Sequence, residues 1–115
     1  MASAAMLDPI GATDAIQAAQ NAPTAATDGY DTKAHRFVNV TVHVTVGTSV
    51  DVQVYLWSGQ AWVLYTDVPT TTVTAANGGG IFQLETRGYP RIAVRVTNLV
   101  GAGCTANVFA RGVTY

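Results

Sequence analysis

The chain has 115 residues, of which 49% are hydrophobic and only 11% are charged, and its formal net charge is −1. This length fits one domain. Six basic residues are too few for the basic patch of a nucleic-acid binder, so we expect no nucleic-acid partner. A lone domain needs a charged exterior to stay soluble, and we therefore expect self-association to cover much of this surface.

The N-terminal residues carry no export signal. No Lys or Arg precedes Lys33, and the positively charged start and apolar block of a secretory signal are missing. No run approaches the ~18 apolar residues of a membrane span. The single cysteine, Cys104, excludes an intramolecular disulfide framework and is predicted to be a buried small residue. We expect a protein that is made without export and has no membrane partner.

Residues 1–30 form an Ala-rich segment without strand periodicity, which we interpret as an N-terminal arm. Thr13 is a candidate cap for a short helix over residues 14–20, which Pro23 would end. A lone helix this short is marginal in water, so the arm is either flexible or docked on a partner. The apolar anchors that suit docking are Met6, Leu7, Ile10 and Ile16.

The pattern changes in the second part of the chain, residues 31–115. In residues 36–46 five valines alternate with polar residues, which is the period of a half-buried strand. Gly and Pro turns separate further predicted strands over residues 50–57, 61–66, 70–75, 81–86, 91–100 and 104–115. The prediction is an all-β domain, an antiparallel β-sandwich or jelly-roll-like barrel of about seven strands behind an extended arm.

The segment YLWSGQAWVLY, residues 55–65, predicts an aromatic hairpin. If Gly59 and Gln60 are the turn residues, Trp57 lies opposite Trp62. Strand parity then places Tyr55, Trp57 and Trp62 on one face and aliphatic side chains on the other. Because both faces are apolar, one belongs to the core and the other needs a cover.

Three interpretations of the aromatic face stay open. It is packed within the chain, forms a subunit interface, or stacks a sugar ring on a tryptophan. The cover is accordingly the N-terminal arm, a neighbouring subunit or a ligand. Arg91 and Arg95 have the opposite parity to the apolar residues of their strand and point outward. They either contact an acidic patch on a partner or belong to an ordinary solvated sheet face.

No arrangement of residues predicts catalysis. His35 and His43 lie at or near the first predicted strand, and Ser49 and Ser58 are turn serines without a nucleophile elbow. The aspartates lack the dense spacing of a calcium loop. We therefore expect no enzyme activity, no catalytic residues, no bound metal and no cofactor.

The Ala-rich leader, the Val/Thr-rich β-module, the hairpin YLWSGQAWVLY and the strand RIAVRVTN together resemble small structural proteins of tailed-bacteriophage virions. Within that group the chain is most similar to capsid decoration (cement) proteins. These are often β-sandwich or jelly-roll modules clustered at capsid symmetry axes. The resemblance covers residues 36–115 as a pattern and the leader as an architectural feature.

This resemblance implies a virion protein made in the host cytoplasm that clamps neighbouring subunits. Its partners would be itself, as a homotrimer, and the major capsid protein or another virion protein. The contact residues implied are Met6, Leu7, Ile10 and Ile16 in the arm and Tyr55, Trp57 and Trp62 on the module. The alternatives are a tail, neck or fibre-associated virion protein, and a carbohydrate- or surface-binding module that stacks a glycan on Trp57 and Trp62.

Overall fold

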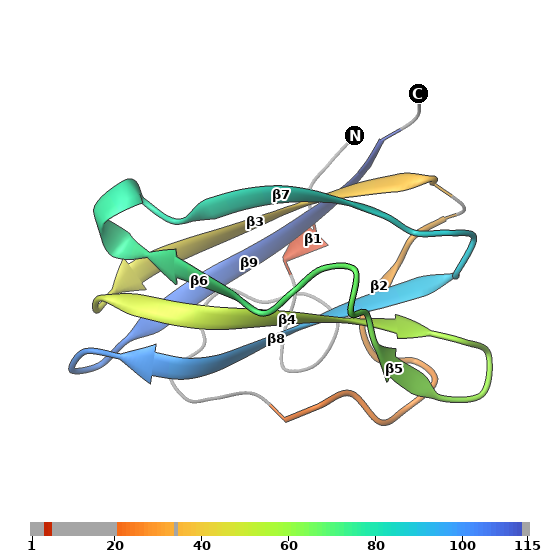
Figure 1. Ribbon diagram of the computed structural model, residues 1–115, viewed down its shortest axis with the longest axis horizontal. Coiled ribbons are helices and arrows are strands. Elements are labelled where there is room, and N and C mark those ends of the chain that lie inside the picture. The colour runs from red at the N-terminus through yellow and green to blue at the C-terminus, as the bar shows by residue number, and fades with distance from the viewer. Residues whose placement is uncertain (1–3, 6–20, 34, 114–115) are drawn as a thin grey trace.

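The computed structural model describes residues 4–5, 21–33 and 35–113, and in these ranges the chain consists of two layered antiparallel β-sheets (Figure 1). The only helical element in the described residues is a single 3₁₀ turn, Ala75–Asn77. The strands are β1 (Ala4–Ala5), β2 (Tyr30–Asp31), β3 (Phe37–Val46), β4 (Ser49–Trp57), β5 (Trp62–Leu64), β6 (Thr71–Thr74), β7 (Gly80–Glu85), β8 (Arg91–Val100) and β9 (Thr105–Val113).

One sheet has the strand order β1-β9-β3-β7, and the other has the order β2-β8-β4-β5, with β6 also paired to β4. After β3 the chain crosses to the other sheet for β4, β5 and β6, returns for β7, crosses again for β8 and returns for β9. The four long strands therefore pair in a nested way, β3 with β9 and β4 with β8. This confirms the predicted antiparallel sandwich.

All seven predicted strands are present as β3 to β9, with end points that differ by a few residues. The largest difference is β5, which spans three residues instead of the expected 61–66. A turn begins at once after it, because the Val68 amide donates to the Tyr65 carbonyl at 3.1 Å. The strands β1 and β2 were not predicted, since two residues are too few to show a period.

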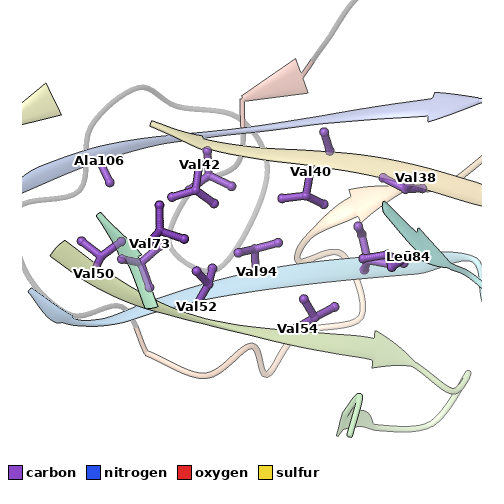
Figure 2. Close-up of a cluster of buried hydrophobic side chains, with 14 of the residues drawn as sticks. Val38, Val40, Val42, Val50, Val52, Val54, Val73, Leu84, Val94 and Ala106 are labelled. Atoms are coloured by element: carbon purple, nitrogen blue, oxygen red, sulfur yellow. The ribbon is translucent and has the colours of Figure 1, made fainter. Parts of the chain in front are cut away.

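The core lies between the two sheets and consists mainly of valine (Figure 2). The alternation seen in the sequence has the expected consequence: Val38, Val40 and Val42 of β3 and Val52 and Val54 of β4 all point inward. Fully burying one such side chain contributes roughly 1.5–3 kcal/mol. β-Branched residues also suit the extended backbone, so local preference and burial favour the same structure.

Cys104 is buried at one end of the sandwich, as predicted. Its sulfur lies 3.6 Å from the Ser49 carbonyl oxygen. Gly47, in the β3–β4 turn, has a φ of 105°, and a Cβ there would lie 2.7 Å from the Cys104 sulfur. Only glycine fits this close approach of the turn to the thiol.

Candidate binding surfaces

The aromatic hairpin has the predicted register. Trp57 pairs with Trp62 and Leu56 with Val63 across β4 and β5. Gly59 has a φ of 99°, and the Ser58 hydroxyl accepts hydrogen bonds from the Gln60 and Ala61 amides at 3.3 and 3.1 Å. A serine and a glycine thus fix the turn, and the turn fixes which side chains share a face.

Trp57 and Trp62 contact each other on the outer face of the β2-β8-β4-β5 sheet. Their ring centroids are 5.5 Å apart with an interplanar angle of 54°, a tilted arrangement of the kind aromatic pairs prefer. Both side chains are half-buried. The Trp62 indole N–H donates to the Ala25 carbonyl at 2.8 Å, so the partner of this polar group lies within the same chain.

The segment 21–29 lies against this outer face and continues into β2, which pairs with β8 (Figure 1). Arg91, at the start of β8, binds three consecutive backbone carbonyl groups of this segment. Its guanidinium donates to the oxygens of Thr27 at 3.0 Å, Asp28 at 2.7 Å and Gly29 at 2.9 Å. A planar guanidinium can reach all three because its N–H groups diverge as a fork.

The same segment is shaped by its own buried residues. One carboxylate oxygen of Asp28 accepts the amides of Thr24 and Ala25, each at 2.9 Å. Gly29 has a φ of 79°, and a Cβ there would lie 2.2 Å from the Ile92 carbonyl oxygen and 2.9 Å from the Trp62 ring. The segment therefore fits the sheet closely only with glycine at this position.

These contacts supply part of the cover that the sequence required. Tyr55, Trp57 and Trp62 lie on the predicted face, and residues 24–29, inside the predicted arm, are bound to that face. Ala93 of β8, opposite Tyr55 on this face, is 0% exposed. Arg91 points outward as predicted but binds the chain's own carbonyls. The other predicted contact residues, Met6, Leu7, Ile10 and Ile16, and the predicted helix lie outside the described residues.

The outer face of the β1-β9-β3-β7 sheet carries an apolar row that sequence reasoning missed. Ile81 of β7 and Phe109 of β9 both pair with Thr41 of β3, so the three side chains form a line across the sheet. Ile81 is 78% exposed, and Phe109 is half-buried. A hollow of about 550 Å³ lies beside them, bounded by the 77–80 turn. The signal was present in the parity of IFQLET, which places Ile81 opposite Leu84.

A pocket of about 300 Å³ lies at the hairpin end of the sandwich, beside the edge strand β5. Its lining includes Val63, Tyr65, Asp67, Arg87 and Tyr89. Asp67 and Arg87 form an ion pair in which both side chains are about half exposed. This group of residues was also missed, because β5 and the turn at Arg87 are 20 or more residues apart and no local pattern connects them.

The described residues contain no group of three His, Cys, Asp or Glu side chains placed to hold a metal ion. His43 is exposed on β3, and Cys104 is buried beside the β3–β4 turn. Neither residue lines the pocket. The described part of the chain also has no helix with the length and apolar character of a membrane span.

Comparisons with protein-family models, with curated proteins and with solved structures each give no match to this chain.

Proposed function

We propose that the protein is a non-enzymatic structural protein of a bacteriophage virion, a decoration or cement protein that stabilises the capsid by bridging neighbouring subunits. The observation that supports this most is the exposed row of Ile81 and Phe109 on the β1-β9-β3-β7 face. Ile81, which is 78% exposed, and Phe109 flank Thr41 and line one hollow together, and contiguous apolar surface of this kind is typical of a surface that meets a partner.

The anchored base of the arm supports the same proposal. Arg91 and Trp62 fix residues 25–29 on one outer face. The arm is also held near its start, where β1 pairs with β9 of the same chain. The part proposed to contact a neighbouring subunit lies between these two points and carries Met6, Leu7, Ile10 and Ile16. Fixing the base lowers the entropy that the arm loses when it binds.

The mechanism is clamping. Each copy contacts another copy through the Ile81 face and a capsid subunit through its arm, so separating two capsid subunits exposes apolar area on both. Such area is worth about 25 cal/mol per Å², and ordering the arm offsets part of it. Several copies around a threefold axis multiply the effect, because linked contacts must break together.

The proposal is tested with particles from the host that produces the protein. Recombinant full-length chain is added to particles stripped of it, and the bound fraction is measured by co-sedimentation. We expect saturable binding, a higher temperature of particle disruption, and at least a roughly tenfold weaker affinity when Met6, Leu7, Ile10 and Ile16 are all changed to serine, which keeps the residues of β1. The control is Val100→Asp, which changes an exposed residue at the end of β8 on the other sheet and should leave the bound fraction unchanged. Absence of the protein from purified particles would contradict the proposal.

A second candidate is a carbohydrate- or surface-binding module, free or as part of a tail, neck or fibre. The pocket at the hairpin end favours it, because tyrosine rings and a charged pair line one concave site. The sequence predicts that a sugar ring stacks on Trp57 and Trp62. Since Trp62 is bound to Ala25, the pocket is the better placed site.

A further inference from the structure

The pocket at the hairpin end gathers exposed apolar side chains. Val63 is 54% exposed, although its partner Leu56 is buried in the core. Tyr89 is also exposed, and Leu56, Val63 and Tyr89 all line the pocket. β5 is the edge strand of its sheet, and the inward side chain of Val63 stays more than half exposed there. The result is an apolar floor that is open to solvent.

Charged groups with a fixed arrangement stand at the side of this floor. Arg87 pairs with Asp67, and its guanidinium carbon lies 5.7 Å from the centre of the Tyr65 ring. The Tyr65 hydroxyl donates to the Glu85 carbonyl at 2.9 Å, which fixes the ring. Donors of the guanidinium and acceptors of the carboxylate are therefore side by side, and their charges cancel.

The turn that presents Arg87 and Tyr89 is itself well defined. The Tyr89 amide donates to the Thr86 carbonyl at 2.9 Å, and Arg87 and Gly88 have φ values of 54° and 80°. Two consecutive positive φ values define a type I′ turn, in which Asn or Gly usually precedes the final glycine. An arginine in this place has an energetic cost, and it carries the guanidinium to the pocket.

We propose that this pocket binds an uncharged sugar ring. The apolar C–H face of a pyranose would lie on Tyr89 and Val63, and neighbouring hydroxyls would accept from Arg87 and donate to Asp67. A neutral polyol fits better than an anion, because the arginine charge is already compensated by the aspartate. The volume of about 300 Å³ suits one sugar residue. This site belongs to the second candidate function proposed above. Because it is separate from the row of Ile81 and Phe109, a failure to bind sugar would not contradict the virion proposal.

The test uses the full-length chain and an array of neutral oligosaccharides, followed by NMR titration with the methyl glycoside of the terminal sugar that binds. We expect saturable shifts of the backbone amides of Tyr65, Asp67, Arg87 and Tyr89. No binding by any neutral sugar up to about 10 mM would overturn the proposal. A response only to long polymers, with none to the methyl glycoside, would also overturn it, because the pocket holds one residue.

Variants locate the site. Tyr89→Ala removes the exposed ring, and Asp67→Asn removes the charge of the acceptor; each is expected to weaken binding at least about tenfold. Trp57→Phe and Ile81→Ala are matched controls on the two outer faces and should leave the affinity unchanged. Amide spectra of each variant check the fold. Binding that survives both pocket variants, or is lost with Trp57→Phe, would overturn the proposal, as would tighter binding of an acidic sugar than of its neutral analogue.

Discussion

The two outer faces of the sandwich differ in what lies on them. On the β2-β8-β4-β5 sheet, Arg91 and Trp62 bind the backbone of residues 25–29, and Ala93 is fully buried. On the β1-β9-β3-β7 sheet, Ile81 is among the most exposed large apolar residues of the described chain. The outer face of this second sheet is otherwise mostly polar, with the Gln83 side-chain amide donating to the Asn39 side-chain oxygen at 2.9 Å. The cover by the chain's own 21–29 segment is seen only on the first face.

The aromatic surface of one face is bound by the chain's own backbone, while the apolar row of the other face is left open. The segment 21–29 provides a hydrogen-bond acceptor for the half-buried Trp62 indole N–H, a partner that buried aromatic N–H groups usually find. A row with one isoleucine and one phenylalanine beside threonine is tolerable when open and is well suited to reversible contact. We infer that the covered face belongs to folding and the open face to assembly.

The largest expected effect comes from placing a charge on each face. Ala93→Asp buries a carboxylate and should lower the free energy of unfolding by at least about 3 kcal/mol. Thr41→Asp places the same carboxylate at the centre of the open face and should cost no more than about 1 kcal/mol. Urea unfolding of both variants measures the difference. Equal losses would show that the two faces are equally covered in the monomer.

Alanine at two glycines separates the fit of the segment from backbone strain. Gly29 and Gly78 have the same φ of 79°, but a Cβ meets the Ile92 carbonyl only at Gly29 and nothing within 4 Å at Gly78. Gly78→Ala should cost about 1–2 kcal/mol from the left-handed backbone. Gly29→Ala should cost roughly 1–3 kcal/mol more, as overpacking does in a core. Similar thermal stabilities for the two variants would mean that the segment is not closely fitted.

Arg91→Lys tests the three carbonyl contacts. Lysine keeps the charge and loses the fork, and we expect the free energy of unfolding to fall by about 1–2 kcal/mol. Hydrogen exchange should rise at the amides of residues 24–29. Arg36→Lys is the control, because Arg36 forms an exposed ion pair with Glu85 that contributes at most about 1 kcal/mol. Unchanged exchange at the segment in Arg91→Lys would refute the role of Arg91 as its anchor.

The smallest effect concerns one hydrogen bond. Trp62→Phe keeps most of the aromatic area and loses the N–H that donates to the Ala25 carbonyl, so it should cost about 1 kcal/mol. Trp57→Phe leaves that bond in place and reports the cost of the smaller ring alone. The difference between the two variants in chemical unfolding isolates the bond. A larger loss in Trp57→Phe would contradict the assignment.

The sandwich was predictable because its strands are long and strictly alternating. The valines of β3 and β4 show the period directly, and Gly59 determines the register of the hairpin. The strands β1 and β2 were not predictable, since their pairing depends on contacts distant in the sequence. The cover of the outer face was not predictable for the same reason. Arg91 binds residues 27–29 because of the place of β8 in the sheet, and no local sequence pattern indicates this contact.

The candidate sites were predictable only in part. Parity placed Tyr55, Trp57 and Trp62 on one outer face and showed that this face needed a cover. It did not identify the pocket, because Tyr65 and Asp67 meet Arg87 and Tyr89 only through the packing of the two sheets. The exposure of Ile81 was equally hidden, since a sequence gives the side on which a residue lies and not what covers that side.

The most direct test of the assembly role of the open face is the solution mass of the full-length chain, measured by light scattering after size exclusion. We expect a closed oligomer, a trimer under the threefold arrangement proposed above, that dissociates in Ile81→Asp and persists in Val100→Asp. A monomer at all concentrations, or an oligomer that Ile81→Asp leaves intact, would contradict this assembly role.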